Sequence, residues 1–554
     1  MASVDYPKLF KAVEDSYARL EPFRRQRNEA IKQYVGYRYQ QEGCEQEKPL
    51  GGLEQVITTY TQQLVGGQPR ALVRANRPEL SPTAADLEVA LNWLVKKLNL
   101  YEALWEVVLN AHFGLGIAQV GMVEAEAAES WWHVLGRPAV NVIDQDDWVH
   151  DVRAKRWEHT YFMGHYYRWP FDVAEKFALF DSEARSQLKP TTGSFVARRS
   201  GIHTPETLVE PVEPQVELLD LWLPKHGLLL TLCPEQRLVL REAQWVGDRQ
   251  GPYHLLYFNP VPGKLMPLTT AMTLGPLDEL CDRVFRKLHE QAVAQKSVLP
   301  FRGGSDDDIR RLKEAANGDA FRCDGDLPQE VRYGGPDKVN LDFLMACVQL
   351  LSRRAGNLEQ LAGLGIQATT LGQEQILQFN ASLRISFMRQ RVYDFVARIF
   401  RALAFYLLTD RLVQLHLIRP LPDIGMELPL VWDAERQQGD IEDYLIEVDV
   451  YSLHHRSAQA QLESILSLLN NFVGPLVPTL AQQGYQFRPE RVLELISRYL
   501  GIPELHYLFE PGEPMPAQLP VAGAAQQASE MLGTEASQYR QTVPRVDVQD
   551  LVAR

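Results

Sequence analysis

The sequence contains few cysteines, and none of them is spaced for a metal site or a disulfide framework. Five cysteines occur in 554 residues, and no two form a Cys-x-x-Cys pair; they are Cys44, Cys233, Cys281, Cys323 and Cys347. Structural zinc sites and small disulfide-rich domains both depend on closely spaced cysteines. The spacing therefore predicts buried thiols in a reducing compartment, and no metal.

Long apolar runs are missing too. No stretch approaches the roughly 18 uncharged residues that cross a bilayer. The first residues, MASVDYPKLFKAVEDSYARL, contain no apolar core of a signal peptide. The sequence therefore predicts neither export nor a membrane partner.

The signatures of several enzyme classes are absent as well. Gly263-Lys264 is followed by leucine and lacks the upstream glycine of a GxxxxGK[ST] phosphate loop. The patterns HExxH, GxSxG and GxGxxG do not occur. We therefore expect a protein that is not an enzyme, with no catalytic residue and no cofactor.

What is present is typical of a large acidic globular protein. The chain is longer than one hydrophobic core supports, so about two to four modules are expected. Apolar residues make up 45% and charged residues 23% of the sequence, and the net charge is -14. That charge argues against a broad basic surface that grips DNA by neutralising phosphates. A negative surface would instead let DNA slide past without sticking.

The first half of the sequence predicts helices followed by a β-rich module. Residues 12–35 have the apolar spacing of a helix, interrupted by Pro22, and residues 82–114 contain two further helical segments. From 116 to 232, aromatic and apolar segments alternate with Pro, Gly and Asp, as in strands and turns. We interpret a basic stripe on the first helix as a solvated face, with contact to DNA or a neighbouring subunit as the alternative; it consists of Arg24, Arg25, Arg27 and Lys32.

The second half is mainly helical. Two helices flank a small insert, 301–336, and are expected to form an antiparallel pair with the insert at its tip. The segment GLGIQATTLGQ, 363–373, is uncharged and rich in glycine, which is typical of a mobile loop. A helix from 374 to 408 would be about 50 Å long. We expect strands in 420–449, helices in 458–508, and disorder in the Ala-, Gln- and Pro-rich end of the chain.

One group of residues has the composition of a metal site. The segment VIDQDDWVHD combines oxygen ligands with an imidazole, at Asp144, Asp146, Asp147, His150 and Asp151. Such a set could hold a divalent metal in a nuclease. We prefer the interpretation as a turn between strands, whose carboxylates cap backbone amides and face water. The pair His454-His455 is likewise interpreted as a solvated turn.

The arrangement from Gly275 to Leu408 resembles the stem, clip, stem, tunnel loop and spine of bacteriophage portal proteins. The segments PLDELCDRVFRKLHEQAVAQKSVLP, AFRCDGD, VRYGGPDKVNLDFL and TLGQEQILQFNASLR are similar to the connector (portal) family of short-tailed, T7-like phages. The segment DDWVHDVRAKRWEHTYFMGHYYR is similar to the wing region of that family. The resemblance covers residues 6–510. It implies an α+β, mainly helical portal fold with wing, stem, clip and crown regions, assembled as a ring.

The resemblance also implies how the chain is divided. The N-terminal wing region would be 1–274, and the clip, 298–336, would stand between stem helices at 275–297 and 337–362. The remaining regions would be a channel loop at 363–373, a spine helix with wing return at 374–457, a crown at 458–510 and a disordered tail at 511–554.

Site residues follow from the same resemblance. Channel-loop residues would offer flexible backbone and neutral hydrogen bonds that do not clamp phosphate; they are Gly363, Gly365, Gln367, Thr369, Thr370, Gly372 and Gln373. Sparse contacts of the first stem helix to the DNA backbone would come from Arg283, Arg286, Lys287 and Lys296. Docking at the clip would use Arg302, Asp306, Asp307, Asp308, Arg310, Arg311 and Lys313. Helix capping is the simpler role for the three aspartates.

By resemblance, the protein forms a homo-oligomeric ring, typically of twelve copies, at the portal vertex of the virion, after assembly in the host cytoplasm. Double-stranded DNA would pass through its channel without sequence specificity, during packaging and ejection, driven by a separate terminase. Tail or adaptor proteins, scaffolding protein and the major capsid protein are the other implied partners. The residues leave two alternatives: a metal-dependent nuclease of the packaging machinery, and a tail or adaptor structural protein.

Overall fold

The computed structural model describes residues 4–36, 50–124, 136–191, 213–298, 331–356, 371–421, 426–449 and 452–453, with 307, 310, 311 and 314. The chain separates into two units, Met1–His455 and Arg456–Arg554, and all described residues belong to the first. Helices and strands both occur in that unit, so the mixed α and β composition is confirmed. The predicted crown and tail, His454-His455, Cys44 and Cys323 lie outside the described residues.

Four helices form the central helical core: α2 (Gly52–Leu64), α3 (Ser81–Lys97), α4 (Leu100–Phe113) and α12 (Leu371–Thr409). The prediction of helices over 82–114 is confirmed by α3 and α4. α12 has 39 residues and is therefore about 58 Å long. Side chains of α12 are completely buried in the core that it shares with α2 and α3, among them Val392, Phe395, Ile399, Phe400 and Leu403.

Strands from distant parts of the sequence complete this core. β1 (Ala71–Ala75) pairs antiparallel with β14 (Tyr444–Val448), and β12 (Leu415–Leu421) pairs antiparallel with β13 (Met426–Trp432). Trp432 is completely buried and donates its indole N–H to the Leu407 carbonyl at 3.1 Å. Two 3-10 turns, η2 (Pro78–Leu80) and η5 (Ile441–Asp443), precede α3 and β14. The strands expected in 420–449 are confirmed.

Two antiparallel sheets follow. Most of their strands lie in residues 116–232, which the sequence predicted to be β-rich, while β8 and β9 come after this region. The larger has the strand order β4-β5-β6-β7-β8, and the smaller has the order β3-β2-β9. The larger sheet consists of β4 (Trp148–His150), β5 (Met163–Pro170), β6 (Gln215–Leu223), β7 (Leu228–Cys233) and β8 (Leu238–Gln244). The smaller consists of β2 (Gly116–Glu124), β3 (Gly136–Ile143) and β9 (Tyr253–Leu256). Short helices lie beside the larger sheet: η3 (Trp157–His159), α5 (Phe171–Lys176) and α6 (Ser182–Ser186).

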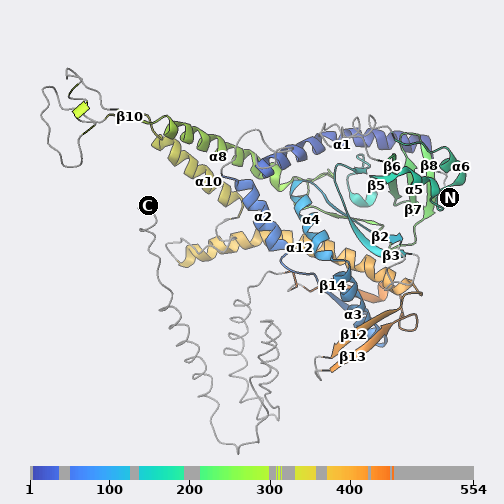
Figure 1. Cartoon of the computed structure of the whole chain (residues 1–554). Helices are drawn as coiled ribbons and strands as arrows, with labels where there is room; N and C mark the ends of the chain where they lie inside the picture. The colour runs from blue at the N-terminus through green and yellow to red at the C-terminus, as the bar shows by residue number, and fades with distance from the viewer. Residues whose placement is uncertain are drawn as a thin grey trace, which may run out of the picture. The chain divides into compact units, whose positions relative to one another are not determined.

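Helix α1 (Tyr6–Val35) joins the sheets to the helical core, as its course in Figure 1 shows. It begins six residues earlier than predicted, because the Asp5 side chain accepts the Lys8 N–H at 3.2 Å and caps the first turn. Residues near its start, among them Phe10 and Val13, pack on the larger sheet. Residues near its end, among them Ile31 and Tyr34, pack against the helical core.

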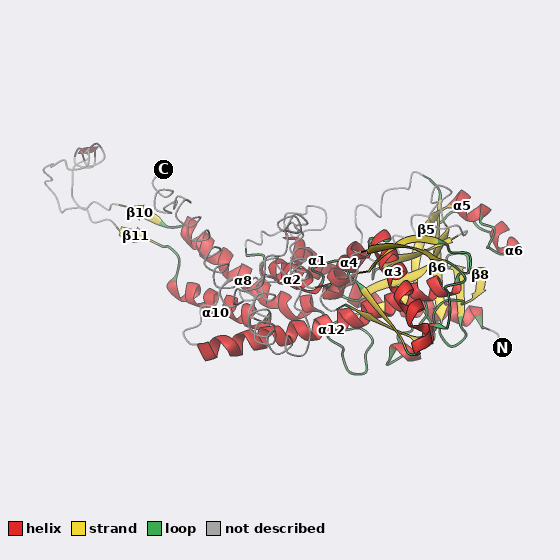
Figure 2. Cartoon of the chain, turned by 90° about the horizontal axis from the view of Figure 1, so that it is seen from below, coloured by secondary structure: helices red, strands yellow, loops and turns green. Residues whose placement is uncertain are grey.

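Helices α8 (Thr270–Val293) and α10 (Lys338–Arg354) form an antiparallel pair. At the end of this pair, β10 (Lys296–Val298) and β11 (Val331–Tyr333) form a two-stranded antiparallel ladder. Figures 1 and 2 show the two helices lying side by side, with the ladder at the tip. The expected arrangement of two helices around an insert is therefore confirmed. The first helix, however, begins before Gly275 and ends at Val293.

Candidate functional site

The helix pair α8–α10 has a small core of its own. Four side chains are buried between the two helices: Cys281, Leu288, Leu344 and Cys347. Burial raises the pKa of the Cys281 thiol to about 11, so this thiol stays protonated near neutral pH. Cys233, Cys281 and Cys347 are all free and buried, as the sequence predicted. The pair is thus held together mainly by apolar contact.

Two buried carboxylates fix the base of α8 to the central helical core. Asp278 accepts the Leu53 backbone N–H at 3.0 Å, and Asp282 accepts that of Leu50 at 3.3 Å. Both carboxylates are almost completely buried. Leu53 lies in the first turn of α2, where backbone N–H groups lack partners within the helix and the helix dipole favours negative charge. The carboxylates of α8 therefore supply the negative charge and the hydrogen-bond acceptors that stabilise the start of α2.

A glycine makes this close approach possible. A Cβ atom at Gly52 would lie 2.7 Å from Leu351 Cδ2 and 2.8 Å from Asp278 Oδ1. Further along α2, the Tyr60 hydroxyl donates to the Ala355 carbonyl, just after α10, at 2.6 Å. Both helices of the pair therefore contact α2 directly, which holds the base of the pair in one position.

The predicted DNA-contacting charges of the first stem helix occupy different environments. Arg283 is exposed and lies 2.8 Å from Glu279, one turn earlier on α8. Lys287 is exposed, whereas Arg286 is partly buried. Lys296 is not on the helix: it belongs to β10 and pairs with Tyr333 of β11. The prediction of Lys296 as a helix residue was therefore wrong, because a ladder across the insert ends the helical path earlier than its apolar spacing suggests.

The predicted channel loop is described only at its end. Gly363, Gly365, Gln367, Thr369 and Thr370 lie outside the described residues. Gly372 and Gln373, in contrast, belong to the first turn of α12, so their prediction as loop residues was wrong. A glycine costs little in a first turn, because the backbone N–H groups there make no intrahelical bond.

The clip residues are described at three predicted positions. Asp307, Arg310 and Arg311 are helical and exposed, and Arg310 lies 3.5 Å from Glu314. All four positions that the structure describes between 299 and 330 are helical: 307, 310, 311 and 314. The other predicted docking residues lie outside the described residues: Arg302, Asp306, Asp308 and Lys313.

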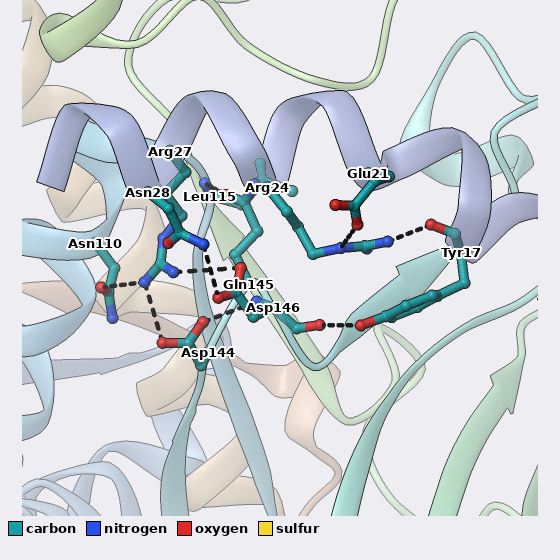
Figure 3. Close-up of polar contacts among 10 residues, drawn as sticks. All are labelled: Tyr17, Glu21, Arg24, Arg27, Asn28, Asn110, Leu115, Asp144, Gln145 and Asp146. Atoms are coloured by element: carbon teal, nitrogen blue, oxygen red, sulfur yellow. Dashed lines mark hydrogen bonds and ion pairs between the residues drawn. The ribbon is translucent and has the colours of Figure 1, made fainter. Parts of the chain in front are cut away.

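The basic stripe of α1 is divided by the fold, and its interpretation as a solvated face was wrong for two of its members. Arg24 and Arg27 are only 1% and 5% exposed, whereas Arg25 is exposed. Figure 3 shows both buried guanidinium groups on the side of α1 that faces the turn between β3 and β4. The reason is helical spacing: Arg24 and Arg27 continue the buried series of Tyr17 and Leu20 along the same face.

Each buried arginine has its own polar partners (Figure 3). Arg27 lies 3.0 Å from Asp144 and 3.5 Å from Asp146. Arg24 lies 3.3 Å from Glu21, donates to the Tyr17 carbonyl, and stacks with its guanidinium carbon 3.6 Å from the centre of the Tyr17 ring. A buried guanidinium is tolerated only when such partners replace its water.

The ion pairs with Arg27 give a structural role to Asp144 and Asp146, two of the aspartates in the turn at residues 144–147. Asp144 also accepts the Asp146 backbone N–H at 2.7 Å, and Asp151 accepts that of Arg153 at 3.0 Å. The preferred interpretation, a turn with carboxylates that cap backbone amides, is thus supported. Asp146 departs from this interpretation, because its pKa is raised overall. Burial and repulsion from Asp144 raise the pKa, and the charge of Arg27 offsets only part of this rise.

The imidazole of this segment points into the protein. His150 is buried and accepts the Trp148 indole N–H at its Nδ1 atom, at 3.1 Å. Burial, together with the smaller effect of the Arg24 charge, lowers the pKa of His150 to about 3. Among the residues that the structure describes, no group of three or more His, Cys, Asp and Glu side chains is placed to hold a metal ion.

Sequence reasoning missed the anchoring residues Asp278 and Asp282. Both fall on the buried side of α8, in the same face as Leu274 and Cys281. An aspartate at an apolar-periodic position requires a polar partner, and this signal could have marked both residues. The partner itself, the start of α2, is far away in the sequence and gave no local sign.

Comparison with known proteins adds nothing to this geometry. No protein-family model matches the chain. A search of curated proteins likewise found no similar sequence. Within the described part of the chain, none of the helices combines the length and the apolar character that crossing a membrane requires.

Proposed function

We propose that this protein is the portal subunit of a short-tailed bacteriophage. Copies of the chain would form a ring at one capsid vertex, and DNA would enter and leave through the channel of that ring. The ring would also be the platform on which terminase and then tail or adaptor proteins attach. A separate terminase would supply the energy for packaging.

The observation that carries this proposal is the order of elements from α8 to α12. Two antiparallel helices lead to and from an insert that is closed by a short ladder, and a helix of 39 residues follows. The same order defines the resemblance of the sequence to portal proteins. Folds host many functions, so the proposal also depends on the similarity of the quoted segments.

The anchored base of the helix pair supports the same function. Asp278, Asp282 and Gly52 join α8 and α10 to the central helical core by hydrogen bonds and close contact. A conduit for DNA must keep its wall helices in register with the rest of each subunit. A rigid base meets that requirement, because local packing there leaves little space for movement.

The decisive experiment is a mass measurement of the purified protein together with negative-stain images. We expect closed rings near twelve subunits, with a wide crown, a narrow stem and an axial hole. A stable monomer at high protein concentration would refute the portal function. A ring without the crown and stem would instead favour the tail or adaptor protein.

A second experiment separates the channel from the ring. Deleting residues 365–370 should leave ring assembly intact and impair DNA retention or packaging. An assembly defect in this variant would refute the assignment of these residues to a channel loop, while leaving the ring itself in place as a proposal.

A further inference from the structure

Helix α10 exposes more large apolar side chains than a helix with one partner should. Five of them are 46–73% exposed: Val339, Leu341, Phe343, Met345 and Leu350. Single exposed apolar residues are common on protein surfaces. Five on a helix of 17 residues form a surface that needs cover, because a helix with apolar residues on most of its sides is normally buried.

These residues form two separate flanks. Successive residues of a helix are turned by about 100°, so Val339, Phe343 and Leu350 lie within about 40° of one another; we call this set flank one. Leu341 and Met345 lie together on the opposite side; we call this set flank two. The residues buried against α8, Leu344 and Cys347, occupy the arc between the flanks.

A polar strip separates the flanks on the side away from α8. It consists of Lys338, Asp342, Gln349 and Arg353, all of them exposed. α10 thus has four sides: one buried on α8, one polar, and two apolar. One partner placed against either flank would leave the other flank in water.

The outer surface of α8 differs from that of α10. It bears charged side chains, among them Glu279, Arg283, Lys287 and Glu290, which are exposed. Large apolar residues are exposed there only at Leu280 and Val293, at 37% and 71%. The need for a further partner is therefore concentrated on α10.

We propose, on the basis of the portal function proposed above, that flank one of α10 packs against flank two of α10 in the next copy of the chain. Each copy then offers two different surfaces to two neighbours, which is a heterologous interface. Such an interface closes into a ring when its rotation permits. A second copy is the one partner that covers both flanks by the same contact repeated.

Helix dimensions agree with this contact. Packed helices lie about 8–10 Å apart, so twelve α10 helices side by side would have a circumference of about 120 Å and a diameter of about 38 Å between axes. Helices about 10 Å thick would leave an opening of about 28 Å. An inner layer of twelve α8 helices would not fit within it. The charged surface of α8 would therefore lie outside the ring of α10 helices. On this arrangement Arg283 and Lys287 would not contact DNA in the channel, contrary to what the resemblance to portal proteins implies.

The test uses two double variants of the full chain and one control. Val339→Arg with Phe343→Arg disables flank one, and Leu341→Arg with Met345→Arg disables flank two. Gln349→Arg places one such positive charge on the polar strip and is the control. All five positions are exposed, and circular dichroism checks that each variant is folded.

Each double variant alone should lose at least tenfold in ring yield, measured by native mass spectrometry, and the control should assemble as wild type does. A mixture of the two double variants should form a heterodimer and stop there. The flank-one variant keeps an intact flank two, the other keeps an intact flank one, and only one productive contact can form between them.

The outcomes separate this inference from the portal function. Wild-type rings together with unimpaired rings of either double variant would overturn the α10 contact alone. A mixture that forms no heterodimer, while the control assembles, would also overturn it. A wild-type chain that stays monomeric would instead overturn the portal function on which the contact rests.

Discussion

The central helical core and the helix pair α8–α10 contain similar amphipathic helices but differ in how completely one chain buries their apolar side chains. In the core, residues such as Phe395 and Leu403 are completely buried within one chain. In the pair, four side chains are buried between the two helices, while Phe343 and its neighbours on α10 remain about half exposed. One region is complete in a single chain. The other has apolar surface left over for a partner, and this difference is what the ring proposal uses.

The largest effect should come from opening a cavity in the complete region. Phe395→Ala should lower the free energy of unfolding by about 3–5 kcal/mol, because Phe395 is fully buried. Phe343→Ala should cost less than about 1 kcal/mol in dissociated chains, since half of that side chain is already in water. Thermal unfolding of both variants under dissociating conditions measures the difference. Equal losses would contradict the distinction between the two regions.

Helix α1 tests whether burial of charge can be as important as burial of apolar surface. Arg27→Ala leaves Asp144 and Asp146 without their partner and should cost about 3 kcal/mol. Arg25→Ala, two residues away and exposed, should stay within about 0.5 kcal/mol of wild type. Thermal midpoints of the two variants provide the comparison. A harmless Arg27→Ala would mean that the buried ion pairs do not hold α1 to the sheets.

Acid should destabilise the protein through buried histidines such as His254, in β9. Burial, together with the smaller effect of the Arg398 charge, lowers the pKa of His254 to about 3. Between this pKa and the unfolded value near 6.5, the unfolded chain binds a proton that the folded chain does not, so stability falls as pH falls below about 6.5. At about pH 5 the loss from one such residue approaches about 2 kcal/mol.

His254→Gln isolates this contribution. Its stability relative to wild type at about pH 8 measures the change in packing alone. At about pH 5 the free energy of unfolding of the variant, relative to that of wild type, should be about 2 kcal/mol higher than at about pH 8. Thermal unfolding at both pH values measures this change. An identical difference at both values would show that His254 does not contribute to the acid sensitivity.

The smallest effect is expected where the two regions meet. Gly52→Ala forces the side chains of Leu351 and Asp278 to move, at a cost of about 1–2 kcal/mol. Gly121→Ala, in β2, meets no atom within 4 Å and should be close to neutral. Hydrogen exchange at the Leu53 amide, which donates to Asp278, should accelerate in the first variant only. Unchanged exchange would show that the base of α8 tolerates the added methyl group.

Much of the helical organisation could be read from the sequence. The apolar spacing predicted α1, α3, α4, α8, α10 and α12, but some ends were displaced by up to about two turns. α1 begins six residues earlier than predicted, and α10 ends at Arg354 instead of residue 362. The ends were less predictable, as Gly372 and Lys296 show, because they depend on capping and on a strand ladder across the insert. Of the candidate site, the order of elements was predictable, while the anchors at Asp278 and Asp282 were not.

The sequence by itself determined most of the long helices and the β-rich region, because periodicity is a local property that neighbouring residues carry. The tertiary structure alone decided which charges are buried: Arg24 and Arg27 enter the protein, while Arg25 between them stays in water. It also decided that β1 pairs with β14 across most of the chain. The physical reason is the same in both cases, since the stabilising partner is distant in sequence and becomes a neighbour only after folding.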